Sequence, residues 1–229
     1  MDFILNYLDK YSKFTEYVDF YNEQKSEIGL NEIKKIIQPK DVTEHYKGLP
    51  PLLYIIKHSY NDKINAKFSN EAIRYLLPDT LVNNTYEGVS PLSWVLSKNI
   101  SNDYDTLIQD IKPDDVNLLC KKFKGKTPIN AYLKLINWVR PHINVLKILA
   151  PINDILLITD EKKRTPLIVY IENNKMHYNY VLFFLIGEEN SGVTDIKYGN
   201  LFPLNLYYRH TTNGRDLESD DIEVYKKLL

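Results

Sequence analysis

The sequence has a single cysteine, Cys120, and no long apolar stretch. One thiol excludes an internal disulfide framework and any zinc site built from several cysteines. The longest apolar run, Tyr180 to Gly187, is far shorter than the roughly 18 residues that a membrane-spanning helix needs. The first residues also lack the basic segment and small-residue cleavage site of a secretory signal. We therefore expect no contact with a membrane.

An excess of charge of one sign is also missing. The 29 Lys and Arg residues are balanced by 30 Asp and Glu residues, which gives a net charge of −1. This balance argues against a protein that binds a polyanion through its bulk charge, so nucleic acid is not the expected partner. A local basic patch remains open.

Recognisable catalytic, cofactor and metal motifs are absent. The five histidines are scattered, and none forms a nucleophile motif with Cys120 or a serine. There is no glycine-rich phosphate loop and no metal-ligand spacing. Lys121 and Lys122 could lower the pKa of the Cys120 thiol, but a partly buried loop residue is the simpler interpretation. We expect a protein that is not an enzyme and that binds no cofactor or metal.

What the sequence does have is a repeat. Five prolines, each followed by Leu or Ile, are separated by intervals of 40, 37, 38 and 37 residues. They are Pro51, Pro91, Pro128, Pro166 and Pro203. Proline suits the first turn of a helix, because its fixed φ fits the helix and its missing N–H needs no partner there. Ser90, Thr127 and Thr165 come directly before three of these prolines, where a hydroxyl can cap free N–H groups.

A second apolar segment follows each proline-started helix. Apolar residues recur after each proline at helical spacing, and a variable polar stretch then leads to the second segment. A helix breaker ends four of the five second segments, at Pro78, Pro113, Pro151 and Gly187. The 13 to 16 residues that remain before the next aligned proline favour an extended turn or a hairpin-like finger. Each unit is therefore two helices and a finger.

One helix pair cannot bury its apolar stripe alone, whereas stacked neighbours bury it continuously. The sequence thus predicts an all-α solenoid of stacked helix pairs with extended finger loops. We expect N-terminal capping helices and a first finger over residues 1–47, and five divergent repeats over residues 48–229. Because the last segment stops inside a second helix, we expect a longer chain.

These motifs resemble the ankyrin repeat, and the helix starts are similar to those of poxvirus ankyrin proteins. The matching segments are Thr127–Leu133, with the sequence TPINAYL, and Thr165–Ile171, with the sequence TPLIVYI. The period here is longer than the usual 33 residues. The histidine that ankyrin repeats carry two residues after the proline is replaced in every copy, by Leu53, Ser93, Asn130, Ile168 and Asn205.

The resemblance implies a function. It implies a host-range or immune-evasion adaptor that captures a host antiviral protein, such as an interferon-induced one, in the host cytoplasm. A C-terminal F-box-like segment, which is not visible here, would recruit a cullin-type ubiquitin ligase that marks the captured protein for degradation.

Ankyrin folds bind proteins through finger tips and first-helix faces. On this basis the candidate protein-binding residues are Tyr46, Tyr86, Glu87, Phe123, Lys124, Trp138, Lys162, Arg164 and Tyr198. The tyrosines before three helix starts could instead pack between fingers. Trp94 lies beside an apolar stripe and is expected in the core, whereas Trp138 falls in a loop between helices.

Two alternatives remain open at this point. The basic runs Lys121–Lys126 and Glu161–Arg164 occupy equivalent places in neighbouring fingers. They could form a ridge that binds RNA, or they could simply be solvated turns. A structural scaffold with no dedicated partner is the other alternative.

Overall fold

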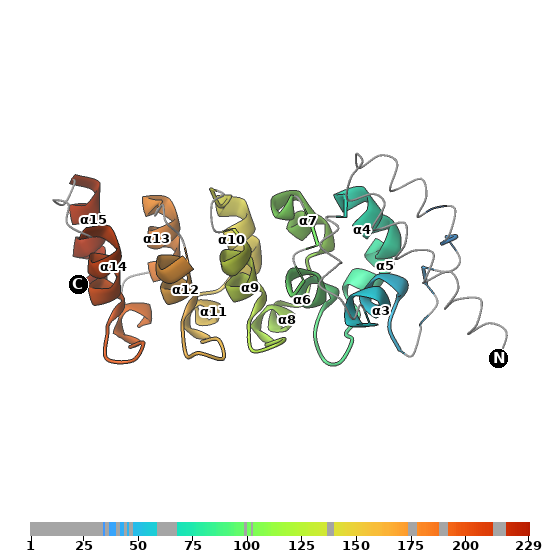
Figure 1. Ribbon diagram of the computed structural model, residues 1–229, viewed down its shortest axis with the longest axis horizontal. Helices are drawn as coiled ribbons and strands as arrows, with labels where there is room; N and C mark the ends of the chain where they lie inside the picture. The colour runs from blue at the N-terminus through green and yellow to red at the C-terminus, as the bar shows by residue number, and fades with distance from the viewer. Residues whose placement is uncertain are drawn as a thin grey trace. The chain divides into compact units, whose positions relative to one another are not determined.

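A computed structural model shows an all-α architecture in the residues that it describes (Figure 1). The described residues are 34, 37–39, 42–43, 45, 48–58, 68–98, 100–101, 103–136, 140–173, 178–187, 192–212 and 219–229. Within these ranges, extended backbone pairing is limited to isolated bridges. The chain divides into two compact units, Met1–Asp114 and Asp115–Leu229, which we call unit 1 and unit 2.

Unit 1 contains two rows of packed helices. Its described helices are α3 (Pro51–His58), α4 (Asn70–Leu76), α5 (Asp79–Val82), α6 (Pro91–Leu96) and α7 (Tyr104–Ile111). The proline-started helices α3 and α6 pack on each other, and so do the second helices α4 and α7. The predicted capping helices of residues 1–47 lie almost wholly outside the described residues.

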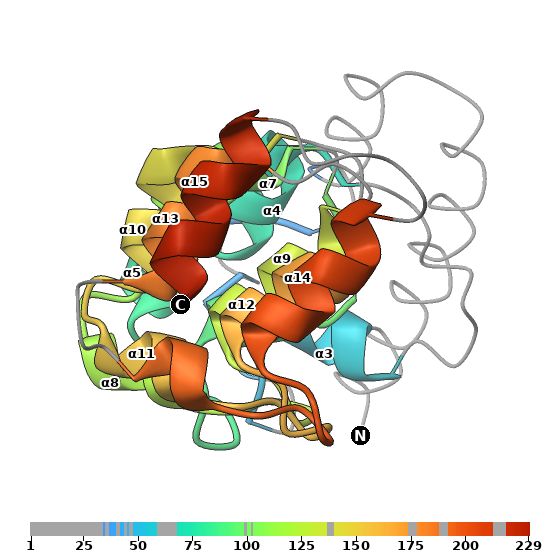
Figure 2. The same ribbon diagram turned by 90° about the vertical axis from the view of Figure 1, so that its left-hand side faces the viewer.

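Unit 2 repeats the same arrangement with more copies. Its helices are α8 (Val116–Cys120), α9 (Pro128–Leu135), α10 (Ile143–Leu149), α11 (Asp154–Leu157), α12 (Pro166–Asn173), α13 (Asn179–Ile186), the 3₁₀ turn η1 (Val193–Asp195), α14 (Pro203–Thr212) and α15 (Ser219–Leu228). Helix α12 packs between α9 and α14, while α13 packs between α10 and α15. Figure 2 looks along these two rows, so the helices of each row lie one behind another.

The predicted helix starts are confirmed. All five aligned prolines are the first residue of a helix. The Thr127 hydroxyl accepts a hydrogen bond from the Asn130 N–H at 3.5 Å, and Thr165 accepts one from Ile168 at 3.4 Å. Ser90 forms no such cap, and its Oγ lies 3.4 Å from the Oγ of Ser93 instead. The four predicted breakers each follow the end of a second helix by one or two residues.

The fingers differ from the predicted extended turn. Each described finger begins with a short helix, namely α5, α8, α11 or η1. A tight turn then leads into the next proline-started helix, and in three fingers an isolated antiparallel bridge closes it. Segments of three to five residues are too short to display a helical period, so sequence patterning did not reveal them.

The core of each unit lies between its two helix rows. In unit 2, the fourth residue after each aligned proline is a tyrosine with at most 1% of its surface exposed. These residues are Tyr132, Tyr170 and Tyr207. The Tyr170 hydroxyl accepts a hydrogen bond from the Tyr178 N–H at 3.0 Å, which ties the first helix of that repeat to the second. Among the described helices, none has the length and apolar character that crossing a bilayer requires.

Candidate protein-binding surface

Tight turns present the finger tips. In Tyr86–Val89, the central residues Glu87 and Gly88 have φ values of 53° and 78°. In Phe123–Lys126, Lys124 and Gly125 have φ values of 49° and 74°. Two successive positive φ values define a type I′ turn, which matches the twist of a hairpin. Glu87 and Lys124 both occupy the first central position and are exposed there.

The finger turn at Asp160–Arg164 is one residue longer and is held by charge. The Asp160 N–H donates to the Arg164 carbonyl at 2.8 Å, and Lys163 adopts a φ of 62°. The Asp160 carboxylate accepts hydrogen bonds from the backbone N–H groups of Lys162 at 2.8 Å and Arg164 at 2.9 Å. It also accepts a bond from the Arg164 guanidinium at 2.7 Å. Asp160 and Arg164 are both buried, so this ion pair fixes the shape of the turn.

These two fingers of unit 2 are joined directly. The Glu161 N–H donates to the Gly125 carbonyl at 2.7 Å. A Cβ atom added to Gly125 would lie only 2.5 Å from the Cβ of Glu161, so the two turns approach as closely as a glycine allows. The turns therefore hold their side chains in a fixed mutual arrangement.

Positive charge gathers around this junction. Lys126 is half-buried, whereas Lys134, on α9, and Lys162 are exposed. The charge of Lys126 lowers the pKa of Lys134, with further contributions from partial burial and from the charges of Arg164 and Lys162. The lowered pKa shows that the ammonium of Lys134 is repelled by the positive charges around it. We call Lys126, Lys134 and Lys162 the lysine cluster.

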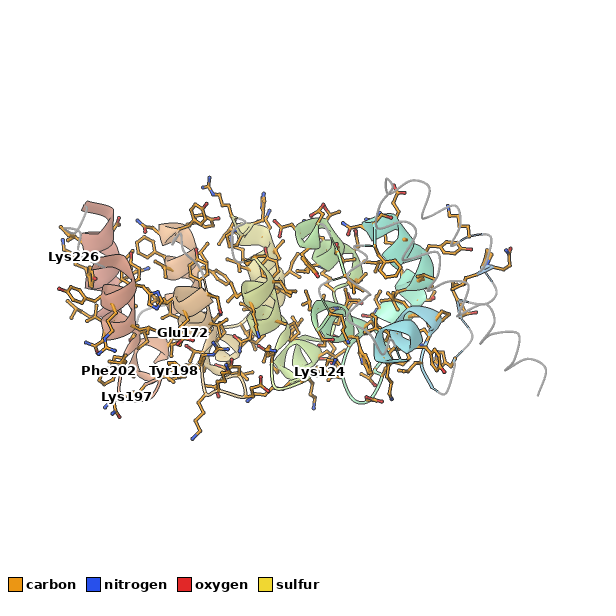
Figure 3. The ribbon with its side chains drawn as sticks, viewed as in Figure 1. Lys124, Glu172, Lys197, Tyr198, Phe202 and Lys226 are labelled. Atoms are coloured by element: carbon orange, nitrogen blue, oxygen red, sulfur yellow. The ribbon has the colours of Figure 1, made fainter. Side chains whose placement is uncertain are left out.

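A third turn of unit 2 carries aromatic side chains. Tyr198–Leu201 is closed by a bridge, with Gly199 at a φ of 61°. The ammonium of Lys197 lies 4.5 Å from the centre of the Phe202 ring, and Phe202 is 40% exposed. Figure 3 shows Lys197, Tyr198 and Phe202 together at the end of this finger.

The predicted binding residues fall into three groups. Glu87, Lys124 and Lys162 are exposed, and Phe123 and Tyr198 are half-buried, so all five are accessible at turns. Within unit 1, Glu87 forms an ion pair with Lys57. Tyr46 and Trp138 lie outside the described residues.

Tyr86 and Arg164 form the third group, because the structure places them in the interior. Tyr86 is 4% exposed, and its carbonyl accepts a hydrogen bond from the indole N–H of Trp94 at 3.2 Å. Burial raises the pKa of the Tyr86 hydroxyl. Arg164 is 6% exposed and donates to Glu172 at 2.8 Å as well as to Asp160. Neither side chain is placed to meet a partner. For Tyr86, this burial agrees with the alternative in which the tyrosines before the helix starts pack inside the fold. Trp94 is 2% exposed, which confirms its expected place in the core.

Sequence reasoning missed Lys134 and Phe202 as accessible residues at the turns. Lys134 lies on α9, eight residues after Lys126, and no local motif marks it. Phe202 comes directly before an aligned proline, at the position of the capping residues Thr127 and Thr165, which offered a signal.

Cys120 is the last residue of α8 and is partly buried. Burial, followed by the negative charges of Asp154 and Asp115, raises the pKa of its thiol, and Lys121 opposes this only weakly. A raised pKa does not favour a nucleophile. Among the described residues, no group of three or more His, Cys, Asp or Glu side chains is placed to hold a metal ion.

An apolar hollow of about 460 Å³ lies where α10 begins. It is lined by Arg140, Pro141, His142, Ile143 and Tyr180. The Arg140 guanidinium stacks near two rings, 5.2 Å from that of Tyr180 and 5.4 Å from that of Tyr178. The hollow belongs to the second-helix row rather than to the finger turns.

No family model, curated protein or solved structure matches the chain in sequence or structure comparisons.

Proposed function

We propose that this protein is an ankyrin-type repeat scaffold that binds another protein through its finger turns and first-helix faces. The observation that carries the proposal is the recurring unit of proline-started helix, second helix, short helix and tight turn. In unit 2, first helices pack with first helices and second helices with second helices, as repeated modules do. Such stacking leaves the turns accessible along one edge of the unit.

The turn residues have the chemistry of a contact surface. Arg and aromatic residues dominate the energetics of protein interfaces, and half-exposed rings bury apolar area at small entropic loss. Phe123, Tyr198 and Phe202 supply such rings, and Lys124 and Lys197 lie against two of them. The turns are rigid, because backbone bridges and the Asp160–Arg164 pair hold them, so little order has to be gained on binding.

Site-specific photo-crosslinking in interferon-treated cells tests this proposal. The variants Lys124→benzoylphenylalanine and Tyr198→benzoylphenylalanine place the crosslinker on turns. The matched controls place it at Lys147 on α10 and Lys226 on α15, which are also exposed in unit 2. We expect a discrete crosslinked protein from the turn positions only. Equal labelling from the control positions, or no crosslinked protein at all, would contradict the proposal.

We also propose a biological role, which rests on the resemblance to poxvirus ankyrin proteins. The captured partner would be a host antiviral protein in the host cytoplasm, delivered to a cullin-type ubiquitin ligase through an F-box-like segment. Proteasome inhibition should then restore the abundance of the crosslinked protein in cells that express the protein. If expression of the chain leaves the abundance of the crosslinked protein unchanged, the chain binds that protein without causing its degradation, and the proposed biological role is wrong.

A further inference from the structure

The lysine cluster is an unusual concentration of charge in a chain that is nearly neutral overall. From Lys121 to Lys134 there are five lysines and no acidic residue. The hydrogen bond between Glu161 and Gly125 brings a second basic turn, with Lys162 and Lys163, against this segment. Lys126, Lys134 and Lys162 thus come from two fingers and a first helix and share one region of unit 2.

The charges of the cluster are not balanced within the fold. In the described part of the chain, no ion pair is formed by Lys126, Lys134 or Lys162. Arg164 differs, because Asp160 and Glu172 both pair with its guanidinium. Glu161 is the nearby carboxylate that acts on Lys134, and it does so more weakly than the surrounding positive charges. The Lys134 ammonium therefore lies within reach of the positive charges of Lys126, Arg164 and Lys162, and an anionic ligand bound there would relieve that repulsion.

We propose that the lysine cluster is the recognition site for an acidic segment of the bound protein, a stretch with carboxylates spaced along an extended peptide. This inference rests on the proposed function and specifies the chemistry of its partner. Two lysines on adjoining turns and a third on α9 match separate carboxylates, since an ammonium acts as a point charge with freely oriented donors. The neighbouring half-exposed Phe123 ring adds an apolar contact for a residue between those carboxylates.

RNA fits the same site less well. Unit 2 has 16 Lys and Arg against 13 Asp and Glu, an excess of only three positive charges. Affinity for a nucleic acid backbone rises with the number of phosphates neutralised, and this excess is small for that purpose.

Fluorescence anisotropy with a labelled peptide of alternating glutamate and glycine tests the site in the whole protein. A peptide with glutamine in place of glutamate is the control for charge, and a labelled single-stranded poly(U) of equal length tests RNA. The protein variant is Lys126→Gln with Lys134→Gln. Its matched control is Lys147→Gln with Lys226→Gln, which makes the same change in net charge on exposed residues of α10 and α15. Figure 3 shows Lys226 away from the finger turns.

We expect the glutamate peptide to bind more tightly than the glutamine peptide. The cluster variant should lower its affinity about tenfold, because two ion pairs at the protein surface are lost, and the control variant should leave it nearly unchanged. Equal losses in the two variants, or no preference for glutamate over glutamine, would overturn the site. Tighter binding of poly(U), with a steeper dependence on salt, would overturn it in favour of RNA.

Peptide binding without any crosslinked cellular protein would keep the site and reject the proposed function, so the two failures are distinguishable. Circular dichroism checks that both variants fold.

Discussion

Arg164 is buried because two carboxylates neutralise it inside unit 2. A basic residue just before a helix-starting proline looks, from the sequence, like an exposed finger tip. The side chain turns inward instead, where Asp160 lies four residues earlier and Glu172 eight residues later. A buried guanidinium needs partners on several of its donors, and these two carboxylates supply them. Its charge therefore shapes the turn and leaves the contact surface to Lys124 and Lys162.

Asp160→Ala tests this arrangement. We expect the free energy of unfolding at neutral pH to fall by about 3 kcal/mol, because a guanidinium is left buried without its main counter-charge. Two backbone N–H groups of the turn also lose their acceptor. Urea unfolding followed by circular dichroism measures the loss. Asp160→Asn keeps an acceptor oxygen and removes only the charge, so its loss should be smaller.

The same ion pair gives the stability a dependence on pH. Burial opposes ionisation of Asp160, but hydrogen bonds from Arg164 and Lys162 outweigh it and hold the pKa of the carboxyl below its ordinary value. Its contribution is therefore complete above the unfolded value of about 3.9 and is lost as the pH falls through the lower folded value. The gap in stability between the natural protein and Asp160→Asn should shrink in acid. A gap that stays constant from neutral to acidic pH, or a loss for Asp160→Ala below about 1 kcal/mol, would contradict the account of a buried pair.

The finger turns use glycine for two different reasons. Gly88 and Gly125 hold the same position in their turns, with φ values of 78° and 74°. Around Gly88 no atom lies within 4 Å of an added Cβ, whereas at Gly125 the Cβ of Glu161 would be 2.5 Å away. Both glycines supply the backbone conformation, but only Gly125 permits contact between fingers.

This difference predicts two unequal mutations. Gly88→Ala should lower the free energy of unfolding by about 1 kcal/mol, which is the strain of a left-handed alanine. Gly125→Ala should lower it by about 2–3 kcal/mol, because the turn at Glu161 must also move. Thermal and urea unfolding of the two variants measure both values. Equal losses of unfolding free energy in the two variants would show that the close approach of the fingers adds nothing to stability, since the two glycines have nearly the same φ.

The helix pairs were predictable because their signals are local. Proline chemistry fixes where a helix starts, and apolar residues at helical spacing identify its buried face. The short helices α5, α8 and α11 carry no such period, so the fingers were predicted as plain turns. The surface was predicted only in part, because Lys134 is acted on by Lys126 and by the next finger's Arg164 and Lys162, and the Tyr86 ring packs against His45, which lies far earlier in the sequence. Those contacts are tertiary and follow no short motif.

The two units differ in charge. Unit 1 has 13 Lys and Arg against 17 Asp and Glu, a net charge of −4, whereas unit 2 carries +3. The overall value of −1 therefore hides an uneven distribution along the chain. Because the basic fingers belong to unit 2, we expect added salt to weaken binding of an acidic partner there.

Stability within unit 2 should spread from neighbour to neighbour, since each helix pair packs only on adjacent pairs in a stacked array. Helix α12 is the middle member of its row and contacts both α9 and α14, while α14 contacts α12 and α15. Leu167 on α12 and Leu206 on α14 are both buried, at 0% and 7% exposed, so they offer a matched pair of truncations.

Leu167→Ala should lower the free energy of unfolding by about 2–5 kcal/mol and speed amide hydrogen exchange in α9, α12 and α14. Leu206→Ala should speed exchange mainly in α14 and α15 and leave α9 protected. Mass spectrometry of peptides from each helix separates the two patterns. An identical rise in exchange across the whole unit from both variants would indicate a single cooperative core, and the modular description of the fold would then fail.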